Sequence, residues 1–351
     1  MAEKIVLLMS GGTDSSAAAL LLLREGWEVV GLTFPVPRAE GGASPVPEAA
    51  ELARALGIEH HYVDVSEVFR QRVTEPFRRE YSLGRTPCPC AECNAWVKFG
   101  FLWDYARSTL GAVHFATGHY ARAYCEGGEG HLAAAGNAKK DQSYFLYGVK
   151  KDRLPYLHFP LAERTKDEAR ALLAEAGLRE RVSGESMDLC FAGREGYRAV
   201  IGKERPGPVT DTSGRVLGSH TGIENYTIGQ RKGLGIPHTS PLYVVETDPA
   251  SNTVVLGEYE EGLTDTLEIS GVNVLEPRWA KAGEELLGKI RSTGSPKPCR
   301  IESVSEQGMT VRFAKEFFVT SPGQKLVLYD SGGTVVLGGT IEKCRRKACC
   351  G

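Results

Sequence analysis

Cysteine is the residue whose number and spacing in this chain most suggest chemistry. The 351 residues include nine cysteines, of which Cys88, Cys90 and Cys93 form a cluster and Cys190 stands alone. No basic segment followed by an apolar run opens the chain and no apolar run is long enough to span a membrane, so we expect a cytoplasmic protein. Cysteines in such a protein are more often catalytic, metal-binding or buried than joined in a disulfide framework. Polar neighbours of Cys93 and Cys190 favour a chemical role over a small buried side chain.

A second group of residues suited to chemistry is the run Ser10-Gly11-Gly12-Thr13-Asp14-Ser15-Ser16. Small residues between a strand and a helix let backbone N–H groups approach an anion, and the helix N-terminus adds partial positive charge. Asp14 is suited to hold Mg²⁺ beside phosphates. The alternative is a plain turn that caps the helix, but every position of the run suits an anion. The pattern predicts a nucleotide site that is neither a Walker loop nor a dinucleotide fingerprint.

Alternating strand and helix patterns must position these residues in the N-terminal part of the chain. We expect strands at residues 4–9, 27–33, 60–65 and 112–117, and helices at 14–25, 47–56, 97–110 and 166–175. Strands separated by helices of this length indicate βαβ units and a parallel sheet. The proline-rich segment 35–47 is expected to form a mobile loop.

The pattern changes to short strands punctuated by turns after about residue 206. Candidate strands lie at 208–210, 215–217, 242–246, 253–256, 310–313, 325–329 and 334–337. Such spacing indicates a small β domain followed by a β-barrel. We therefore expect a mixed α/β protein with three domains: a parallel-sheet catalytic domain (1–204), a small central β-rich domain (205–269) and a C-terminal β-barrel (270–351).

The overall charge gives little sign of a nucleic-acid partner. The net charge is −2 and the sequence pI is about 6.5, whereas nucleic-acid-binding domains are usually basic. A nucleic-acid partner would have to contact local basic clusters such as residues 139–140, 231–232 and 345–347. Each cluster taken singly is more typical of a solvated surface.

The phosphate-binding run resembles the signature of the PP-loop ATP pyrophosphatases, which split ATP to AMP and pyrophosphate and adenylate a carbonyl oxygen. Five further segments narrow the resemblance to the bacterial tRNA-specific 2-thiouridylases: residues 84–99, 116–121, 140–146, 186–191 and 226–234. The resemblance extends over essentially the whole chain. It implies that the first domain has the PP-loop, adenine nucleotide alpha hydrolase-like fold and that the barrel contacts tRNA.

The resemblance implies ATP-dependent 2-thiolation of the wobble uridine, position 34 of tRNA. ATP would adenylate the C2 carbonyl oxygen, and a cysteine persulfide would then deliver sulfur. Cys190 matches the persulfide carrier, Cys93 the thiol that releases sulfur by forming a disulfide bond, and Asp14 the acidic residue of the ATP site. The implied ATP-binding residues are Leu8, Met9, Ser10, Gly11, Gly12, Thr13, Asp14, Ser15, Phe34 and Gly118. Mg²⁺ is expected with ATP.

The sequence departs from the family pattern at Cys88 and Cys90. The resulting thiols, Cys90 and Cys93 with Cys190, leave open a second mechanism in which a 4Fe–4S cluster holds the incoming sulfide. Zinc bound by four thiolates is a further alternative. The persulfide relay is the preferred hypothesis.

The resemblance also implies contacts with tRNA. The segment Cys88, Pro89 and Cys90 would lie against the target base. Further tRNA contacts would come from Lys140, Asp141, Gln142, Arg291 and Ser292, although the family has tyrosine where this chain has Ser292. The expected partners are tRNAs of the lysine, glutamate and glutamine type and an upstream sulfur-carrier protein or cysteine desulfurase.

Three side chains near these motifs are expected to be structural. His119 would support the nucleotide site without exchanging protons. Trp96 and Trp103, seven positions apart on one predicted helix, would both belong to the core. Two other functions stay open: a PP-loop ligase or amidotransferase acting on a small molecule, and an RNA-binding module without catalysis. The intact phosphate loop and both cysteines favour the thiolation enzyme.

Overall fold

The computed structural model describes residues 2–36, 47–178, 189–192, 200 and 205–346. Most of the predicted loop at 35–47, residues 186–188 before Cys190 and the end of the chain from residue 347 lie outside the described residues. No helix in these described ranges is long and apolar enough to cross a membrane.

A five-stranded parallel sheet forms the N-terminal part, with the order β3-β2-β1-β4-β7. Its strands are β1 (Lys4–Leu8), β2 (Glu28–Thr33), β3 (Glu59–Tyr62), β4 (His114–Ala116) and β7 (Leu157–His158). Helices α1 (Thr13–Arg24), α2 (Pro47–Leu56) and α7 (Lys166–Glu175) alternate with the strands. The predicted parallel α/β architecture is confirmed.

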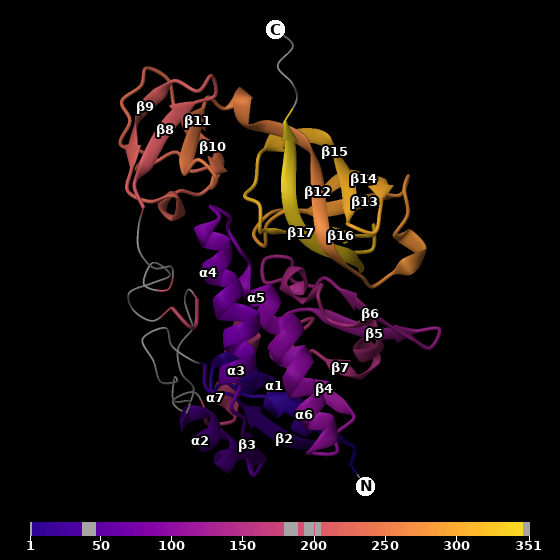
Figure 1. Cartoon of the computed structure of the whole chain (residues 1–351). Coiled ribbons are helices and arrows are strands. Elements are labelled where there is room, and N and C mark those ends of the chain that lie inside the picture. The colour runs from indigo at the N-terminus through magenta and orange to yellow at the C-terminus, as the bar shows by residue number, and fades with distance from the viewer. Residues whose placement is uncertain (1, 37–46, 179–188, 193–199, 201–204, 347–351) are drawn as a thin grey trace. The chain divides into compact units, whose positions relative to one another are not determined.

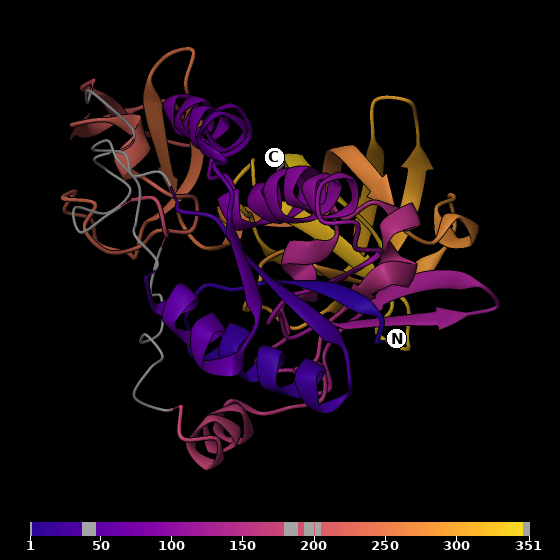
Figure 2. The same ribbon diagram turned by 90° about the horizontal axis from the view of Figure 1, so that it is seen from below.

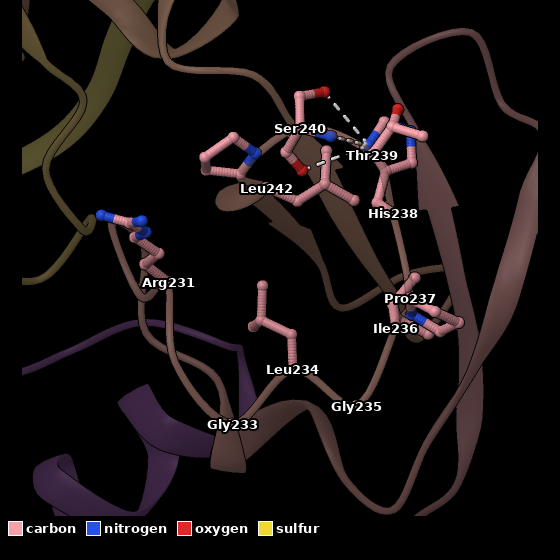
Figure 3. Close-up of a pocket in the computed structure, with 11 residues that line it drawn as sticks. Arg231, Gly233, Leu234, Gly235, Ile236, Pro237, His238, Thr239, Ser240 and Leu242 are labelled. Carbon is pink, nitrogen blue, oxygen red and sulfur yellow. Dashed lines mark hydrogen bonds between the residues drawn. The ribbon is translucent and has the colours of Figure 1, made fainter.

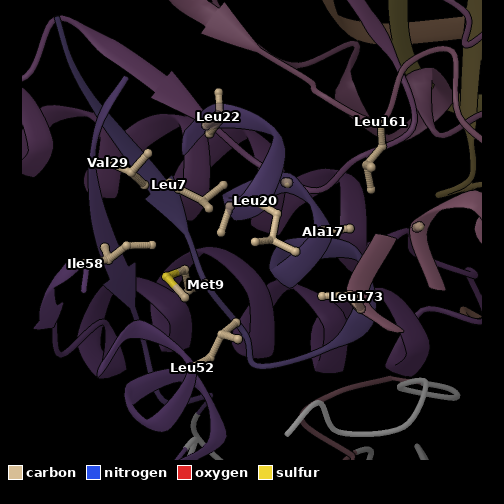
Figure 4. Close-up of a cluster of buried hydrophobic side chains, with 14 of the residues drawn as sticks. Leu7, Met9, Ala17, Leu20, Leu22, Val29, Leu52, Ile58, Leu161 and Leu173 are labelled. Atoms are coloured by element: carbon tan, nitrogen blue, oxygen red, sulfur yellow. The ribbon is translucent and has the colours of Figure 1, made fainter. Parts of the chain in front are cut away.

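One face of the sheet buries an aliphatic core (Figure 4). Alternate residues of β1, Ile5 and Leu7, point to this face because successive side chains of a strand face opposite sides. They pack against Ala17 of α1, Leu52 of α2 and Leu173 of α7, all at most 1% exposed. Figure 2 shows the pink helix α7 near the indigo helices, and α7 contacts α1 directly. This core fixes the first turn of α1 against the end of β1.

Aromatic side chains connect the sheet to a second group of helices: α5 (Pro89–Glu92), the π-helix η2 (Cys93–Leu102) and α6 (Trp103–Ser108). The ring of Phe115 lies 6.0 Å from that of Phe99 and 5.7 Å from that of Trp103. The helix predicted at 97–110 begins earlier, at Pro89, and is π-helical for the ten residues of η2. Trp103 is 3% exposed, but Trp96 is 44% exposed, so its prediction as a core residue is wrong. The α-helical period used for that prediction does not hold across a π-helix.

The remaining elements of the N-terminal part are short. They are α3 (Ser66–Phe69), the π-helix η1 (Arg70–Thr74), α4 (Glu75–Ser82), the hairpin β5 (Arg122–Glu126) and β6 (Glu129–Ala133), and the 3₁₀ helices η3 (Ser143–Leu146) and η4 (Lys151–Tyr156). Neither α4 nor this hairpin was expected from the sequence.

The β-rich part contains two sheets (Figure 1). A four-stranded sheet has the order β10-β11-β8-β9, from β8 (Gly207–Asp211), β9 (Val216–His220), β10 (Tyr243–Asp248) and β11 (Thr253–Gly257). The 3₁₀ helices η6 (Ile223–Asn225), η7 (Glu260–Gly262) and η8 (Pro277–Trp279) lie in its connections and in those of the barrel. A closed barrel has the order β12-β15-β14-β13-β16-β17, from β12 (Leu263–Val274), β13 (Glu285–Lys289), β14 (Lys297–Val304), β15 (Met309–Phe318), β16 (Lys325–Tyr329) and β17 (Val335–Arg346). The expected barrel is confirmed, although β12, β13 and β14 were missed and β15 and β17 are longer than predicted.

The chain divides into two compact units that exchange short segments. Unit 1 contains residues 1–73, 90–200 and 333–335, and unit 2 contains the remaining residues. Within unit 1, the Ala134 N–H donates to the Gly333 carbonyl at 2.9 Å. Within unit 2, the Thr86 N–H donates to the Pro322 carbonyl at 2.8 Å. The division into three domains with boundaries near 204 and 270 stays a prediction.

Candidate active site

The loop between β1 and α1 is shaped by its own hydroxyl groups. Ser15 Oγ donates to the Gly12 carbonyl at 3.1 Å and accepts from the Ser10 N–H at 3.2 Å. Ser16 Oγ also donates to the Gly12 carbonyl, at 2.7 Å. Gly12 is the N-cap of α1 and makes no side-chain cap. The N–H groups of the first turn are therefore the donors that an anion at this helix end would meet.

Two glycines keep side chains away from this loop. Gly11 has a φ of +74°, and a Cβ there would lie 2.8 Å from the Cβ of Glu48 in α2. A Cβ on Gly118 would lie 2.8 Å from both the Asp14 carbonyl carbon and the Ser15 nitrogen. Gly118, an expected ATP-binding residue, therefore packs directly on the first turn of α1.

Both carboxylate oxygens of Asp14 have partners. Tyr120 Oη donates to Oδ1 at 2.9 Å, and Lys166 Nζ donates to Oδ2 at 3.3 Å. Lys166 is the first residue of α7, and a capping box between Thr165 and Glu168 fixes that helix end. The lysine forms an ion pair with this carboxylate. An incoming Mg²⁺ ion would have to compete with Lys166 for this ligand.

The expected tRNA-contacting segment 140–142 is joined to the same network. Gln142 Oε1 accepts from the Tyr120 N–H at 2.9 Å, and the Gln142 N–H donates to the Tyr120 carbonyl at 2.8 Å. Asp141 Oδ1 accepts from the backbone of Ala135 and Ser143 at 3.2 and 3.0 Å. Asp141 and Gln142 thus use their side chains to fold the segment, whereas Lys140 is exposed.

Three cysteines of unit 1 lie close enough to influence each other's ionisation. Burial raises the pKa of Cys93 to about 12, and Cys190 and Cys90 contribute to this increase. Burial and then Cys90 raise the pKa of Cys190. Cys93 is buried. Cys90 and Cys190 reach the surface, although burial is still the largest cause of the raised pKa of each thiol, and all three are free thiols. The fold therefore places the two predicted catalytic cysteines, which are far apart in the sequence, within electrostatic range of each other.

Lys98 supplies positive charge to these thiols. It lowers the pKa of Cys90, Cys93 and Cys190, in each case against the larger effect of burial. Cys93 and Lys98 are five positions apart on η2. An α-helix, with 3.6 residues per turn, would turn them to different faces, whereas a π-helix bonds residues five apart on adjacent turns. The π-helical form thus places the cation beside the thiol.

The π-helix is supported from outside by a buried arginine. Arg153, 7% exposed, donates through Nη1 to the carbonyls of Phe99 and Gly100, the latter at 3.2 Å, and through Nη2 to Asp104 at 3.0 Å. Asn94, 2% exposed, donates through Nδ2 to the Phe145 carbonyl at 3.0 Å. Its Oδ1 has no partner in the described part of the chain.

His119 lies among aromatic rings, and its expected role beside the nucleotide stays a prediction. Its Nδ1 shares a hydrogen bond of 2.7 Å with Thr117 Oγ1, and its ring lies 6.0 Å from that of Phe99 and 6.2 Å from that of Phe159. Burial and then Lys98 lower the pKa of His119 well below 6.5. The imidazole is therefore neutral at physiological pH, which suits a structural role.

The other predicted site residues are distributed over both units. Leu8 and Met9 are buried at the end of β1, and Phe34 is half-buried after β2. In unit 2, Cys88 is buried and Pro89 begins α5. Arg291 is exposed and Ser292 half-buried after β13, also in unit 2.

The sequence analysis missed three residues that complete the site. Tyr120 and Lys166 were not predicted as partners of Asp14, and the charge of Lys98 was not assigned to the cysteines. Tyr120 and Lys98 lie inside the segments that carry the family resemblance, and this location was the one indication that the sequence offered for them. No group of three His, Cys, Asp or Glu residues suited to hold a metal ion occurs among the described residues.

Comparison with known proteins covers nearly the whole chain. The tRNA methyl transferase HUP domain family matches residues 3–194, the tRNA methyl transferase PRC-barrel domain residues 198–258 and the aminomethyltransferase beta-barrel domain residues 264–341. A 4-thiouridine synthetase solved with RNA and ATP is 22% identical with a TM-score of 0.36, over 51% of this chain and 42% of its own, which is too distant for a functional inference.

Two relatives match this chain over nearly their full length and are both named tRNA-specific 2-thiouridylase MnmA. The tRNA-specific 2-thiouridylase MnmA of a Synechococcus species is 40% identical over 352 residues, which cover 98% of each chain. The protein of the same name from a Bradyrhizobium species is 42% identical over 361 residues, which cover 96% of this chain and 89% of the relative. At this identity over nearly its full length, the chain belongs to the tRNA-specific 2-thiouridylase family.

Proposed function

We propose that the protein is an ATP-dependent tRNA 2-thiouridylase that replaces the C2 oxygen of the wobble uridine with sulfur. The observation that carries this proposal is that Cys190 acts electrostatically on Cys93 in one compact unit that also contains the phosphate loop. A nucleotide site alone would suit many adenylating enzymes. The pair of thiols adds the means to accept and release one sulfur atom.

ATP is the expected substrate of the loop between β1 and α1. The N–H groups of the first turn of α1 would bind its phosphates, and Lys166 would move from Asp14 to a phosphate oxygen when Asp14 binds Mg²⁺. When bound, Mg²⁺ would neutralise part of the negative charge of the phosphates. The C2 carbonyl oxygen of the uridine attacks the α-phosphorus, pyrophosphate leaves, and the base becomes an O-adenylate whose oxygen now departs with AMP.

Sulfur then passes through the two cysteines. The Cys190 thiol accepts a sulfur atom from the persulfide of a donor protein, which leaves as a thiol. The terminal sulfur of the Cys190 persulfide attacks C2 and AMP leaves. The Cys93 thiolate attacks Cys190 Sγ, so that the sulfur stays on the base as 2-thiouridine and a Cys93–Cys190 disulfide forms. A thiol reductant restores both thiols for the next turnover.

The difference in burial supports this division of roles. An exposed Cys190 is accessible to a donor protein, whereas Cys93 is shielded. With its pKa raised to about 12, Cys93 is protonated before the substrate binds. Lys98 favours its thiolate, so the attacking form would arise when the uridine complex forms around this cation. The protonated resting state would protect the enzyme from premature disulfide formation.

The alternative with an iron–sulfur cluster is a separate hypothesis. Cys90, Cys93 and Cys190 as the fold places them do not form a group suited to a metal, so we derive no step through a cluster. Measuring iron and acid-labile sulfide in anaerobically purified protein distinguishes the two mechanisms. About four irons per chain would favour the cluster mechanism over the persulfide relay.

We also propose that tRNA contacts Lys140 and Arg291 through phosphate groups. Both side chains are exposed cations, whereas Asp141 and Gln142 position their segment. Contacts of the target base with Cys88, Pro89 and Cys90, a contact at Ser292, and a preference for lysine, glutamate and glutamine tRNAs belong to the same proposal. So do the cytoplasmic location and the upstream sulfur donor.

The decisive experiment combines purified protein, an unmodified lysine tRNA transcript, MgATP and a persulfide donor under anaerobic conditions. Mass spectrometry should detect 2-thiouridine in the nucleoside digest, and assign it to position 34 in nuclease fragments, only when ATP is present, together with equimolar AMP. AMP formed equally well without tRNA, and without thiouridine, would instead favour a PP-loop ligase or amidotransferase that acts on a small molecule. Tight tRNA binding with no AMP would favour an RNA-binding module.

A further inference from the structure

Three aromatic rings of unit 2 meet where the four-stranded sheet joins the barrel. Tyr243 of β10 lies 5.2 Å from Phe318 of β15, and Tyr259 lies 5.3 Å from Phe318 and 5.8 Å from Tyr243. Phe318 is tightly packed, because a Cβ on Gly262 would overlap its ring. Tyr259, however, is 47% exposed. The inner two rings thus support an outer ring that remains nearly half exposed.

Two arginines border this aromatic cluster. The guanidinium of Arg231 lies 6.0 Å from the centroid of Tyr243. Arg291 approaches from the barrel, since its Nη2 would lie 3.6 Å from a Cβ on Gly229. Both arginines are exposed, and no ion-pair partner of either occurs among the described residues. Unpaired arginines near aromatic rings retain their charge for an anionic ligand.

The loop that carries Arg231 is held rigidly. Gln230 accepts from the Thr227 N–H at 3.1 Å and donates to the Lys232 carbonyl at 3.0 Å. The backbone of Gly229 and Gln230 pairs with Val244 at 2.8 and 2.9 Å, which extends the ladder of β10. Gly229 adopts a φ of +88°, which favours glycine. The side chain of Gln230 therefore fixes the turn that presents Arg231 beside Tyr243.

The same loop borders a hollow of about 670 Å³, lined by residues 231–242 except Lys232. Figure 3 shows Leu234 and Leu242 facing this hollow, whereas Arg231 points away from Leu234. Glu258, Glu260 and Glu261 lie directly before and after Tyr259. Their negative charge would repel a phosphate at Tyr259 itself, so phosphates are favoured on the arginine side and an uncharged base on the tyrosine ring.

We propose that Tyr259, supported by Tyr243 and Phe318 and flanked by Arg231 and Arg291, stacks on an unpaired base of the tRNA whose backbone phosphates bind the two arginines. This inference rests on the proposed function, since it names a contact with its substrate. Unpaired bases are recognised by aromatic stacking with cationic backbone contacts, and each stack contributes in a sequence-tolerant way.

The test measures tRNA affinity of the full-length protein by filter binding over a range of salt. Tyr259→Leu should raise the Kd roughly tenfold, because leucine offers no ring for a base to stack on. Tyr259→Phe should bind as the wild type does, since it keeps the ring. Arg231→Met should instead reduce the slope of log Kd against log salt by about one, because one phosphate contact is removed. Tyr259→Leu should leave that slope unchanged.

Tyr62 provides a matched control. It is 50% exposed but lies on β3 in unit 1, and Tyr62→Leu should not change the Kd. Photocrosslinking of the wild type with 5-iodouridine-substituted tRNA adds a readout independent of folding, with Tyr259 or Tyr243 as the expected site. An unchanged Kd for Tyr259→Leu, or crosslinks confined to other segments, would overturn the stacking surface. Either result would leave the proposed function intact, because that function is tested by 2-thiouridine formation in the wild type.

Discussion

The phosphate loop and the cysteine site of unit 1 are built in different ways. The loop is a local structure: residues 10–16 bond among themselves, and glycines 11 and 118 leave room around them. The cysteine site is assembled from distant segments and depends on the π-helical form of η2. The conformation of the loop depends mainly on its own residues and the glycines that pack on it, whereas the cysteine site depends on each of its distant supports. Changing each site separately should therefore affect one of the two steps, adenylation at the phosphate loop or sulfur transfer at the cysteines, without the other.

The largest effect should come from Cys190. We expect Cys190→Ala to reduce 2-thiouridine formation roughly a thousandfold or more, because no thiol accepts the sulfur. AMP formation in the presence of tRNA should persist, since the phosphate loop is untouched. Cys125→Ala, at another exposed cysteine, should behave as the wild type. Thiolation by Cys190→Ala with a persulfide donor would contradict the relay.

Arg153 tests whether the cysteine site depends on its support. Arg153→Met should lower the stability of unit 1 by about 2 to 3 kcal/mol, because the buried carbonyls of Phe99 and Gly100 would be left without a charged donor. The midpoint of urea unfolding measures this effect. Arg54→Met changes an exposed arginine of α2 and should leave the midpoint unchanged. Equal midpoints for both variants would show that η2 does not need Arg153.

Gly118 tests the loop. Gly118→Ala should weaken ATP binding by about tenfold, because the added methyl group would press on the backbone of Asp14 and Ser15. Isothermal titration with a non-hydrolysable ATP analogue measures the affinity. A matched change is Gly332→Ala, whose new Cβ would have only an ordinary contact at 3.4 Å with Asp330. Unchanged ATP affinity in Gly118→Ala would remove Gly118 from the site.

Lys98 should have the smallest effect and the most specific one. Lys98 lowers the pKa of Cys93 and Cys190, so Lys98→Met should raise both and move the thiolate limb of the pH–rate profile to higher pH by about one unit. Single-turnover sulfur transfer from pH 6 to 10 tests this, with Lys98→Arg expected to keep the wild-type profile. An unchanged pH–rate profile in Lys98→Met would show that Lys98 does not affect the ionisation of the reacting thiols.

The contrast also explains what the sequence could predict. The strand, turn and helix around Ser10 are encoded by neighbouring residues, so the loop, the parallel sheet and α7 were predicted correctly. The contacts of Tyr120 and Lys166 with Asp14 depend on tertiary packing that no local pattern encodes. Trp96 and Lys98 point in directions that the sequence analysis did not predict, because the π-helix has a different period from the α-helix that was assumed. The long barrel strands were missed where charged residues alternate on the exposed face.

The exchange of segments between the two units affects how the protein can be made. The ribosome releases residues 74–89 early, but their partners in unit 2 follow only after residue 201. Unit 1, in turn, receives residues 333–335 near the end of synthesis. Neither unit can therefore complete its contacts while the chain emerges, and no single cut yields either unit intact. Separate expression of either unit would therefore require a gene in which its distant segments are joined directly.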